Sequence, residues 1–161
     1  MDAAHADNPL LSLDRDIPFD RIRGEHVEPA AKVLLAEARE KLEALGASTG
    51  PFTYESTLDA LEAVTERLDF TIGVVGHLES VATTPELRAA YNAVQPEVSE
   101  LFSSIALHAG VWNALKSFAA TDEAKALGAT KRRFLDKTLA DFRRSGADLD
   151  PAGKKRLSEI D

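Results

Sequence analysis

Residues 84–115 read TPELRAAYNAVQPEVSELFSSIALHAGVWNAL, and this stretch decides the fold class. Its apolar side chains recur every three or four residues over about thirty positions, which is the spacing of one face of an α-helix. Strict two-residue alternation, the pattern of a half-buried strand, is missing. The stretch therefore predicts a long amphipathic helix. Its apolar face consists of Leu87, Tyr91, Val94, Val98, Leu101, Ile105, His108, Trp112 and Leu115.

Prolines mark the start and the middle of this predicted helix. Thr84, Pro85 and Glu86 supply in order an N-cap side chain, a first-turn proline and an early acid. Pro96 lies inside the pattern, where a proline has no N–H to donate and clashes with the preceding turn. We therefore expect a kink or a break near residues 93–95.

The same helical period continues on both sides of this stretch. It predicts helices over about residues 26–45, 53–82 and 130–144, and a last helix that begins at Asp150 and Pro151. The fold class that follows is all-α, an antiparallel bundle of about five helices.

The domain organisation follows from where the helical period begins. Residues 1–24 contain Pro9 and Pro18 among scattered apolar side chains and predict an irregular but ordered N-terminal arm. Residues 25–161 predict the helical bundle. Its last apolar stripe has barely begun when it stops after Ile160, so we expect the chain to be truncated at its C-terminus.

The predicted helix over residues 53–82 carries a second apolar row beside its main one. A helix that is apolar on two sides predicts neighbours on two sides. Gly73 and Gly76 cost helix propensity, and we expect the compensation to be close approach of another backbone. The second row consists of Phe70, Val74, His77 and Val81.

The composition favours a protein of a reducing compartment. The 161 residues include no cysteine, which excludes disulfides and thiolate metal sites. The N-terminus lacks the basic and apolar regions of a secretory signal. No apolar run approaches the length of a membrane span, so we expect a cytoplasmic protein without a membrane partner.

The net charge of −8 argues against a nucleic-acid partner. Residues 1–120 hold 9 basic and 19 acidic side chains, while residues 121–161 hold 10 and 8, which gives −10 and +2. Nucleic-acid affinity depends on basic side chains that neutralise phosphates. Nucleic-acid binding by this chain stays a minor alternative. If it occurred, the affinity would fall steeply as the salt concentration rises. The basic clusters alternate with acids and predict solvated helix faces: Lys131-Arg132-Arg133, Arg143-Arg144 and Lys154-Lys155-Arg156.

The histidine spacing predicts no metal centre. A helix-borne zinc protease site needs two histidines four residues apart, with a glutamate beside the first as general base. The histidines are His5, His26, His77 and His108, and no pair has that spacing. His77 and His108 can in principle converge with Glu79 or Glu100. We interpret both instead as structural, with their ring nitrogens bonded to backbone or carboxylate partners.

Other catalytic motifs are also missing from the sequence. No Gly-x-Ser-x-Gly elbow is present, and no glycine-rich stretch has the lysine of a phosphate loop. The carboxylates recur at helical spacing and predict exposed faces. We therefore assign no catalytic, cofactor-binding or metal-binding residue in this chain.

Several stretches, in order, resemble the N-terminal region of the thimet oligopeptidase, neurolysin and oligopeptidase A family. They begin with Asn8-Pro9-Leu10-Leu11 and include GVVGHLESVATTPELRAAYNAV from Gly73 and TLADFRRSGADL from Thr138. The resemblance implies an all-helical N-terminal segment of a cytoplasmic zinc metallopeptidase that hydrolyses short peptides inside a channel.

The same resemblance implies that the chemistry lies elsewhere. The family's His-Glu-x-x-His motif lies beyond residue 161, so no zinc or catalytic residue maps onto this chain. The partner that the resemblance implies is a C-terminal catalytic domain carrying the zinc, and this segment alone is expected to be inactive. The alternative is a freestanding helical interaction module without enzymatic activity. A reading frame that continues past Asp161 into His-Glu-x-x-His would favour the peptidase.

Overall fold

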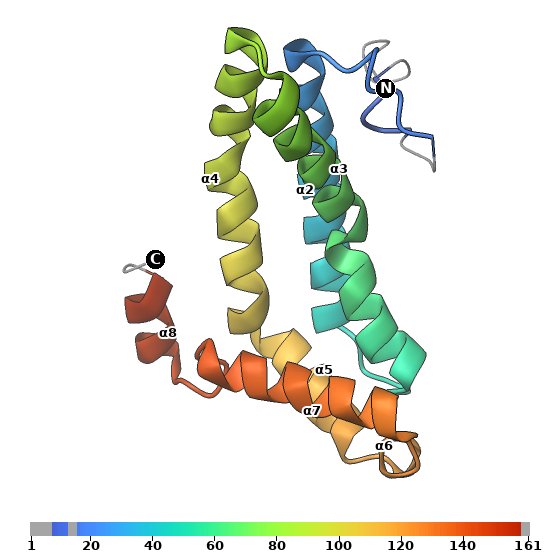
Figure 1. The fold of residues 1–161 in the computed structure, drawn as a ribbon. Helices are drawn as coiled ribbons and strands as arrows, with labels where there is room; N and C mark the ends of the chain where they lie inside the picture. The colour runs from blue at the N-terminus through green and yellow to red at the C-terminus, as the bar shows by residue number, and fades with distance from the viewer. Residues whose placement is uncertain (1–7, 13–15, 159–161) are drawn as a thin grey trace. The chain divides into compact units, whose positions relative to one another are not determined.

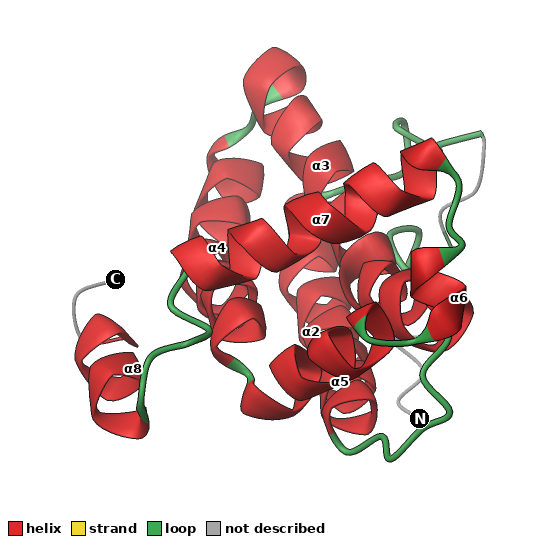
Figure 2. Ribbon diagram, turned by 90° about the horizontal axis from the view of Figure 1, so that it is seen from below, coloured by secondary structure: helices red, strands yellow, loops and turns green. Residues whose placement is uncertain are grey.

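The computed structural model describes residues 8–12 and 16–158, and these residues form helices and turns without a strand (Figure 1, Figure 2). The expected all-α class is confirmed. Among the described residues no helix is long and apolar enough to cross a membrane. The elements are the 3₁₀ turn η1 (Gly24–His26), α2 (Val27–Gly46), the π-helical turn η2 (Glu55–Asp59), α3 (Ala60–Ala82), α4 (Pro85–Leu107), α5 (Ala109–Ala119), α6 (Asp122–Lys125), α7 (Ala129–Arg144) and α8 (Pro151–Ser158).

The contacts of the chain group its residues into two compact units. Unit 1 comprises Met1–Ala38 and Thr65–Ser99, and unit 2 comprises Arg39–Val64 and Glu100–Asp161. Because these boundaries fall inside α2, α3 and α4, each of the three helices contributes residues to both units.

Unit 1 is built around an apolar cluster to which the N-terminal arm, α2, α3 and α4 all contribute. Within it, α3 and α4 form an antiparallel hairpin. Glu79 pairs with Arg88 at 2.9 Å, and a Cβ added at Gly76 would lie 3.1 Å from the hydroxyl of Tyr91. Gly76 therefore permits the close approach expected from the sequence, although a side chain and not a backbone makes it. The cluster comprises Leu10, Ile22, Val27, Ala30, Ala31, Val74, Val75, Leu87, Ala90 and Val94.

The start of α4 has the caps that its sequence predicts. The backbone N–H of Leu87 donates to the Thr84 hydroxyl at 3.2 Å, which satisfies one of the free donors at the helix start. Glu86 follows in the first turn. A hydrogen bond from its own backbone N–H, and then one from the Thr84 hydroxyl, lower the pKa of the Glu86 carboxyl.

Glu86→Gln is expected to destabilise the chain at about pH 7, and the destabilisation is expected to shrink as the pH falls below the unfolded pKa of glutamate, about 4.3. A carboxyl whose pKa is lower in the folded state stabilises above its unfolded pKa, and this stabilisation is lost as the pH falls through the folded value. Urea unfolding at several pH values measures the difference. Glu97→Gln, farther along α4, controls for the loss of one charge, and equal pH profiles for the two variants would contradict the assignment.

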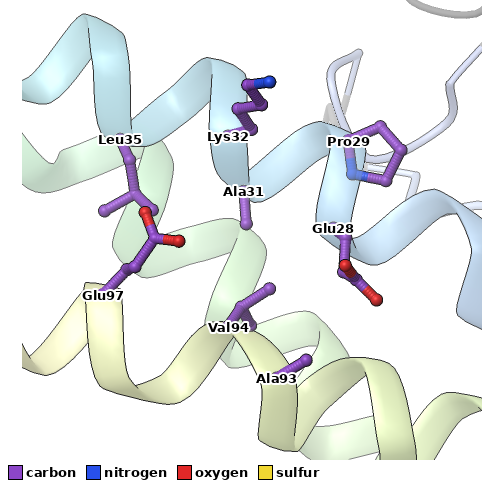
Figure 3. Close-up of a pocket in the computed structure, with 8 residues that line it drawn as sticks. All are labelled: Glu28, Pro29, Ala31, Lys32, Leu35, Ala93, Val94 and Glu97. Atoms are coloured by element: carbon purple, nitrogen blue, oxygen red, sulfur yellow. The ribbon is translucent and has the colours of Figure 1, made fainter.

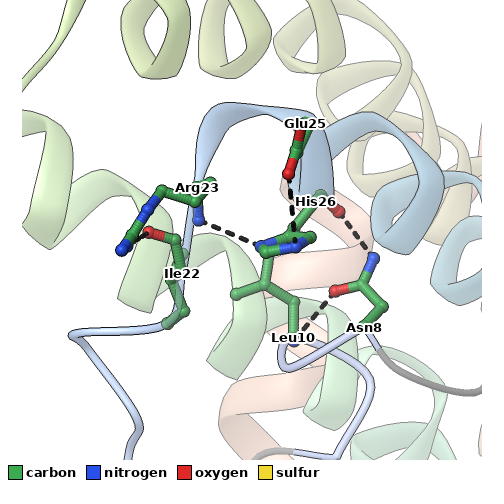
Figure 4. Close-up of polar contacts among 6 residues, drawn as sticks. All are labelled: Asn8, Leu10, Ile22, Arg23, Glu25 and His26. Carbon is green, nitrogen blue, oxygen red and sulfur yellow. Dashed lines mark hydrogen bonds and ion pairs between the residues drawn. The ribbon is translucent and has the colours of Figure 1, made fainter.

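Asn8 anchors the N-terminal arm to the start of α2 (Figure 4). Its side-chain amide donates to the His26 carbonyl at 2.8 Å, and its side-chain oxygen accepts from the backbone N–H of Leu10 at 3.0 Å. Asn8 is only 4% exposed. Its amide therefore satisfies a backbone acceptor and a backbone donor that have little access to water.

The arm is also bound to α3. The hydroxyl of Thr71 donates to the Leu10 carbonyl at 3.3 Å, and the Arg67 guanidinium donates to the Leu11 carbonyl at 3.0 Å. Described residues of the arm therefore contact both η1 and α3, whereas Leu13 lies outside the described residues.

Replacing Asn8 with alanine is expected to lower the free energy of unfolding by about 2 kcal/mol, because buried backbone groups lose their partner. Asn92→Ala, at an exposed position of α4 in the same unit, is the matched control and is expected to change stability by less than about 0.5 kcal/mol. Urea unfolding followed by circular dichroism compares the two. Equal effects of the two substitutions would mean that the arm is not anchored through Asn8.

Unit 2 is built on the packing of α5 with α6 and α7. The Trp112 ring stacks on Phe142 with the ring centroids 6.0 Å apart, and its indole N–H donates to Asp148 at 2.9 Å. Thr121 caps α6 by accepting from the backbone N–H of Ala124 at 3.1 Å. The buried side chains of α5 are Val111, Trp112, Ala114, Leu115 and Phe118, and those of α7 are Leu135, Leu139 and Phe142.

The break in the long predicted helix over residues 84–115 falls at His108 and not at Pro96. The helix α4 runs through Pro96 to Leu107 without a break (Figure 1), so of the kink or break expected near residues 93–95 the break is wrong. His108 adopts an extended backbone conformation and serves as the N-cap of α5. The predicted third helix is therefore two helices, α4 and α5.

The predicted second helix also begins in an unexpected way. Its first turn is the π-helical η2, in which Thr57 and Leu58 are buried, and α3 follows without a break. A π-helical turn inserts one extra residue into a helix and re-aims the side chains that precede it. The sequence contains no breaker at this position that predicts it.

Candidate functional site

The described histidines lie in different elements. His26 ends η1, His77 lies on α3 and His108 precedes α5, while His5 lies outside the described residues. In the part of the chain that the structure describes, no group of three or more His, Cys, Asp or Glu side chains converges as metal ligands would. Because a protein zinc site needs at least three such ligands, these residues do not fit a zinc ion.

His108 uses both ring nitrogens in unit 2. Its Nδ1 accepts from the backbone N–H of Val111 at 3.3 Å, and its Nε2 lies 3.5 Å from a carboxylate oxygen of Glu43. These two neighbours, a backbone N–H and a carboxylate, are of the kinds expected for His108 from the sequence. The junction is also tightly packed, since a Cβ added at Gly110 would lie 2.2 Å from the carbonyl oxygen of Gly46. Nothing in the single sequence identifies this close approach.

The carboxylates that were candidates to join the histidines have cationic neighbours instead. Glu79 pairs with Arg88 within unit 1 at 2.9 Å. Glu100 lies 3.9 Å from the guanidinium of Arg39 within unit 2. Neither is placed as a general base beside a histidine of its own unit.

The second apolar row of α3 is largely exposed. Phe70 is 47% and Val81 66% exposed, His77 is also exposed, and of this row only Val74 is buried. The expectation that neighbours cover both faces of α3 is therefore wrong for the described residues. The physical reason is that the unit 1 cluster forms on the side of Val74 and Val75. Outside that cluster, the ring centroid of Phe19 lies 6.0 Å from that of His77.

Three arginines of the basic clusters near the C-terminus pair with acids. Arg132 lies 3.1 Å from Asp136, Arg143 lies 3.6 Å from Asp148, and Arg144 pairs with Asp141. Pairs of this kind neutralise the charge that a phosphate backbone would need. The clusters therefore have the character of solvated helix faces, as their sequence predicts.

An open pocket in unit 2 surrounds Tyr54. The Lys131 ammonium lies 4.0 Å from the centroid of the Tyr54 ring, and the backbone N–H of Tyr54 donates to Glu123 at 2.9 Å. Burial, and then the negative charges of Asp59 and Glu62, raise the pKa of the Tyr54 hydroxyl. The raised pKa disfavours ionisation of the Tyr54 hydroxyl, and the Lys131 ammonium lies over the Tyr54 ring. The arrangement favours structural packing over proton transfer.

A groove in unit 1 lies between α2 and α4 and has a volume of about 510 Å³ (Figure 3). Its floor is formed by the buried side chains of Ala31, Leu35 and Val94. Charged side chains stand at its rim, among them Glu28 and Glu97. The groove has the chemistry of a contact surface for an apolar side chain, with the charged side chains of Glu28, Lys32 and Glu97 around it.

The described residues form a domain of helices in which no group of three or more His, Cys, Asp or Glu side chains could hold a metal ion. Residues 31–155 match the family described as neurolysin/thimet oligopeptidase, N-terminal domain. This match covers well over half of the chain, and the chain belongs to that family.

Curated relatives agree with the family match. Oligopeptidase A of Escherichia coli (strain K12) is 34% identical over 153 residues, which are 95% of this chain and 22% of that protein. Oligopeptidase A of Haemophilus influenzae is 31% identical, with the same coverage. The organellar oligopeptidase A, chloroplastic/mitochondrial, of Arabidopsis thaliana is 30% identical over 99% of this chain and 20% of that protein. The chain thus spans about a fifth of the length of these relatives.

Proposed function

We propose that this chain is the N-terminal, non-catalytic segment of a zinc metallopeptidase that hydrolyses short oligopeptides. The observation that carries the proposal is the family match over residues 31–155, in a chain that spans 22% of relatives named oligopeptidase A. The arm of residues 1–24 and the helical bundle of residues 25–161 are then the N-terminal portion of the parent. The principal partner is the parent's C-terminal catalytic domain.

The two parts of the parent would have different roles, catalysis and the shaping of a channel. A zinc ion held by the catalytic domain would supply a polarised water that attacks the peptide bond. The helices of this chain supply shape, as part of the wall of a channel that admits a short unfolded peptide and excludes a folded protein. The groove between α2 and α4 supports this role, because Ala31, Leu35 and Val94 provide an apolar floor for a peptide side chain.

The cytoplasm is the proposed location of the parent. The absence of cysteine from the 161 residues is typical of proteins in a reducing compartment. One relative from Arabidopsis thaliana is named as a probable cytosolic oligopeptidase A, although another is named as organellar. Fractionation of cells with an antibody against residues of α7 tests the location.

The test of the proposed function uses the longer polypeptide that the same reading frame encodes. It is expected to cleave a short quenched peptide, to lose this activity with a zinc chelator and to regain it when zinc is restored. A folded protein that contains the same peptide sequence is expected to remain uncut. Cleavage that persists in the chelator, or a stop codon directly after Asp161, would contradict the proposal.

The alternative is a freestanding helical interaction module without enzymatic activity. The exposed Phe70 and Val81 on α3 favour it, because surface apolar rows often mark contacts with another protein. A natural stop codon after Asp161 would support this alternative. A reading frame that continues into His-Glu-x-x-His would exclude it.

A further inference from the structure

An exposed row of side chains runs along one face of α3 in unit 1. Phe70, His77 and Val81 are spaced at i, i+7 and i+11, so they share one face of the helix over about three turns. Phe70 is 47% and Val81 66% exposed. The arm adds Phe19, which is 43% exposed and whose ring centroid lies 6.0 Å from that of His77. We call Phe70, Gly73, His77 and Val81 the α3 row.

Gly73 makes a notch in the middle of the α3 row. A Cβ added there would meet no described atom within 4 Å, whereas a Cβ added at Gly76 would meet the Tyr91 hydroxyl at 3.1 Å. A glycine inside a helix lowers the stability of the helix. At Gly76 the close packing of Tyr91 explains why a glycine is present. At Gly73 no contact in the described residues explains the glycine. A notch between the rings of Phe70 and His77 has the shape that accepts a closely approaching helix.

The exposed apolar side chains of the α3 row favour contact with an apolar partner surface. Phenylalanine and valine left in water lose the stabilisation that their burial would give, and Phe70 and Val81 share one helix face, beside which the arm adds the exposed ring of Phe19. The relatives supply a source for the partner, because the matched chain is 22% of the length of oligopeptidase A from Escherichia coli. Most of such a polypeptide lies outside this chain.

We propose that a helix of the parent polypeptide, from the region that follows residue 161, packs on the α3 row with its backbone over Gly73. This inference rests on the proposed function, since it requires the longer parent. A covalently linked segment is favoured over a second copy of the chain, because the linker holds it at a high effective concentration. The row is thus an interface within one protein and not a substrate surface.

The test of this interface measures the reactivity of a single introduced thiol, which is possible because these 161 residues include no native cysteine. Val81→Cys places a thiol in the row without adding bulk, and Ala89→Cys, at an exposed position of α4, is the matched control. Alkylation of each thiol is followed by peptide mass spectrometry, in this chain alone and in the longer polypeptide. The thiol at position 81 is expected to react at least about tenfold more slowly in the longer polypeptide, because a covered thiol reacts only after local opening. The control thiol is expected to react at similar rates in both.

A second variant tests the notch itself. Gly73→Leu has open space in this chain, so its melting temperature is expected to stay the same or rise. In the longer polypeptide that also carries Val81→Cys, the leucine is expected to displace the covering helix, which would restore the reactivity of the thiol. Unchanged protection of the thiol in that double variant would overturn the close approach at Gly73.

The remaining outcomes distinguish a failure of the proposed interface on the α3 row from a failure of the proposed peptidase function. Equal reactivity of the Val81→Cys thiol in both polypeptides overturns the interface, even if the longer one cleaves peptides. Protection that appears in this chain alone and grows with its concentration identifies a second copy as the partner and also overturns it. A stop codon directly after Asp161 removes the proposed partner and overturns the inference as well. Protection in a longer polypeptide without peptidase activity supports the interface while the proposed function fails.

Discussion

Replacing Trp112 with alanine is expected to lower the free energy of unfolding by about 4 kcal/mol. Trp112 is 3% exposed and stacks on Phe142, so truncation leaves a large cavity between α5 and α7. The substitution also removes the hydrogen bond from the indole N–H to Asp148. It further removes the ring near which the cations of Lys116 and Arg143 lie, at 5.3 and 5.4 Å from its centroid.

The matched control is Trp112→Phe, which retains much of the ring and is expected to cost about 2 kcal/mol. The carboxylate of Asp148 is 60% exposed, so water can replace the lost indole donor. Because Trp112 is the single tryptophan of the chain, urea unfolding must be followed by far-ultraviolet circular dichroism and not by fluorescence. A cost below about 1 kcal/mol for Trp112→Ala would mean that α5 and α7 are not packed through this ring.

Replacing Gly110 with alanine is expected to destabilise the chain by about 3 kcal/mol, even though alanine is the better helix former. A Cβ at this position would lie 2.2 Å from the carbonyl oxygen and 2.8 Å from the Cα of Gly46. These are backbone atoms, so no side-chain rotation relieves the clash. The end of α2 and the start of α5 must move apart, which also disturbs the cap that His108 gives to α5.

Gly73→Ala is the matched control for Gly110→Ala. It makes the same change inside a helix, with no described atom within 4 Å of the new Cβ, and is expected to stabilise this chain by about 1 kcal/mol. Thermal and urea unfolding of the two variants measure the difference. Similar stability changes at the two positions would contradict the close approach of α2 and α5.

The all-α class and the ends of most helices follow directly from the sequence, because local signals fix them. Thr84 caps α4 and Thr121 caps α6, as their side chains favour. Gly146 ends α7 with a φ of 91°, a conformation that glycine adopts without strain. At these positions the local preference and the packing agree.

The break at His108 could not be predicted in this way. The local rule places a break before Pro96, but the apolar side chains of Val94 and Val98 are buried on either side of it, so packing favours a continuous helix. The turn at His108 depends on how closely Gly110 approaches Gly46, which are 64 positions apart in the sequence. A distance of that kind is set by tertiary packing.

The candidate surfaces were only partly predictable. The spacing of the histidines indicates no helix-borne zinc pair, and the described residues contain no group of ligands that fits a metal. The apolar pattern of α3 identifies the row of Phe70, His77 and Val81, but it predicts burial that the described residues do not provide. An apolar pattern records which side chains favour burial, and it does not determine whether the folded chain buries them.

The most direct test of the central claim is made on this chain alone, purified in the presence of zinc. Its metal content is measured by atomic spectroscopy, and its activity by incubation with a short quenched peptide. We expect a folded, helical protein that holds no stoichiometric zinc and leaves the peptide intact, because we propose that the catalytic chemistry belongs to the rest of a longer parent. One tightly bound zinc ion per chain, together with chelator-sensitive cleavage of the peptide, would contradict this account.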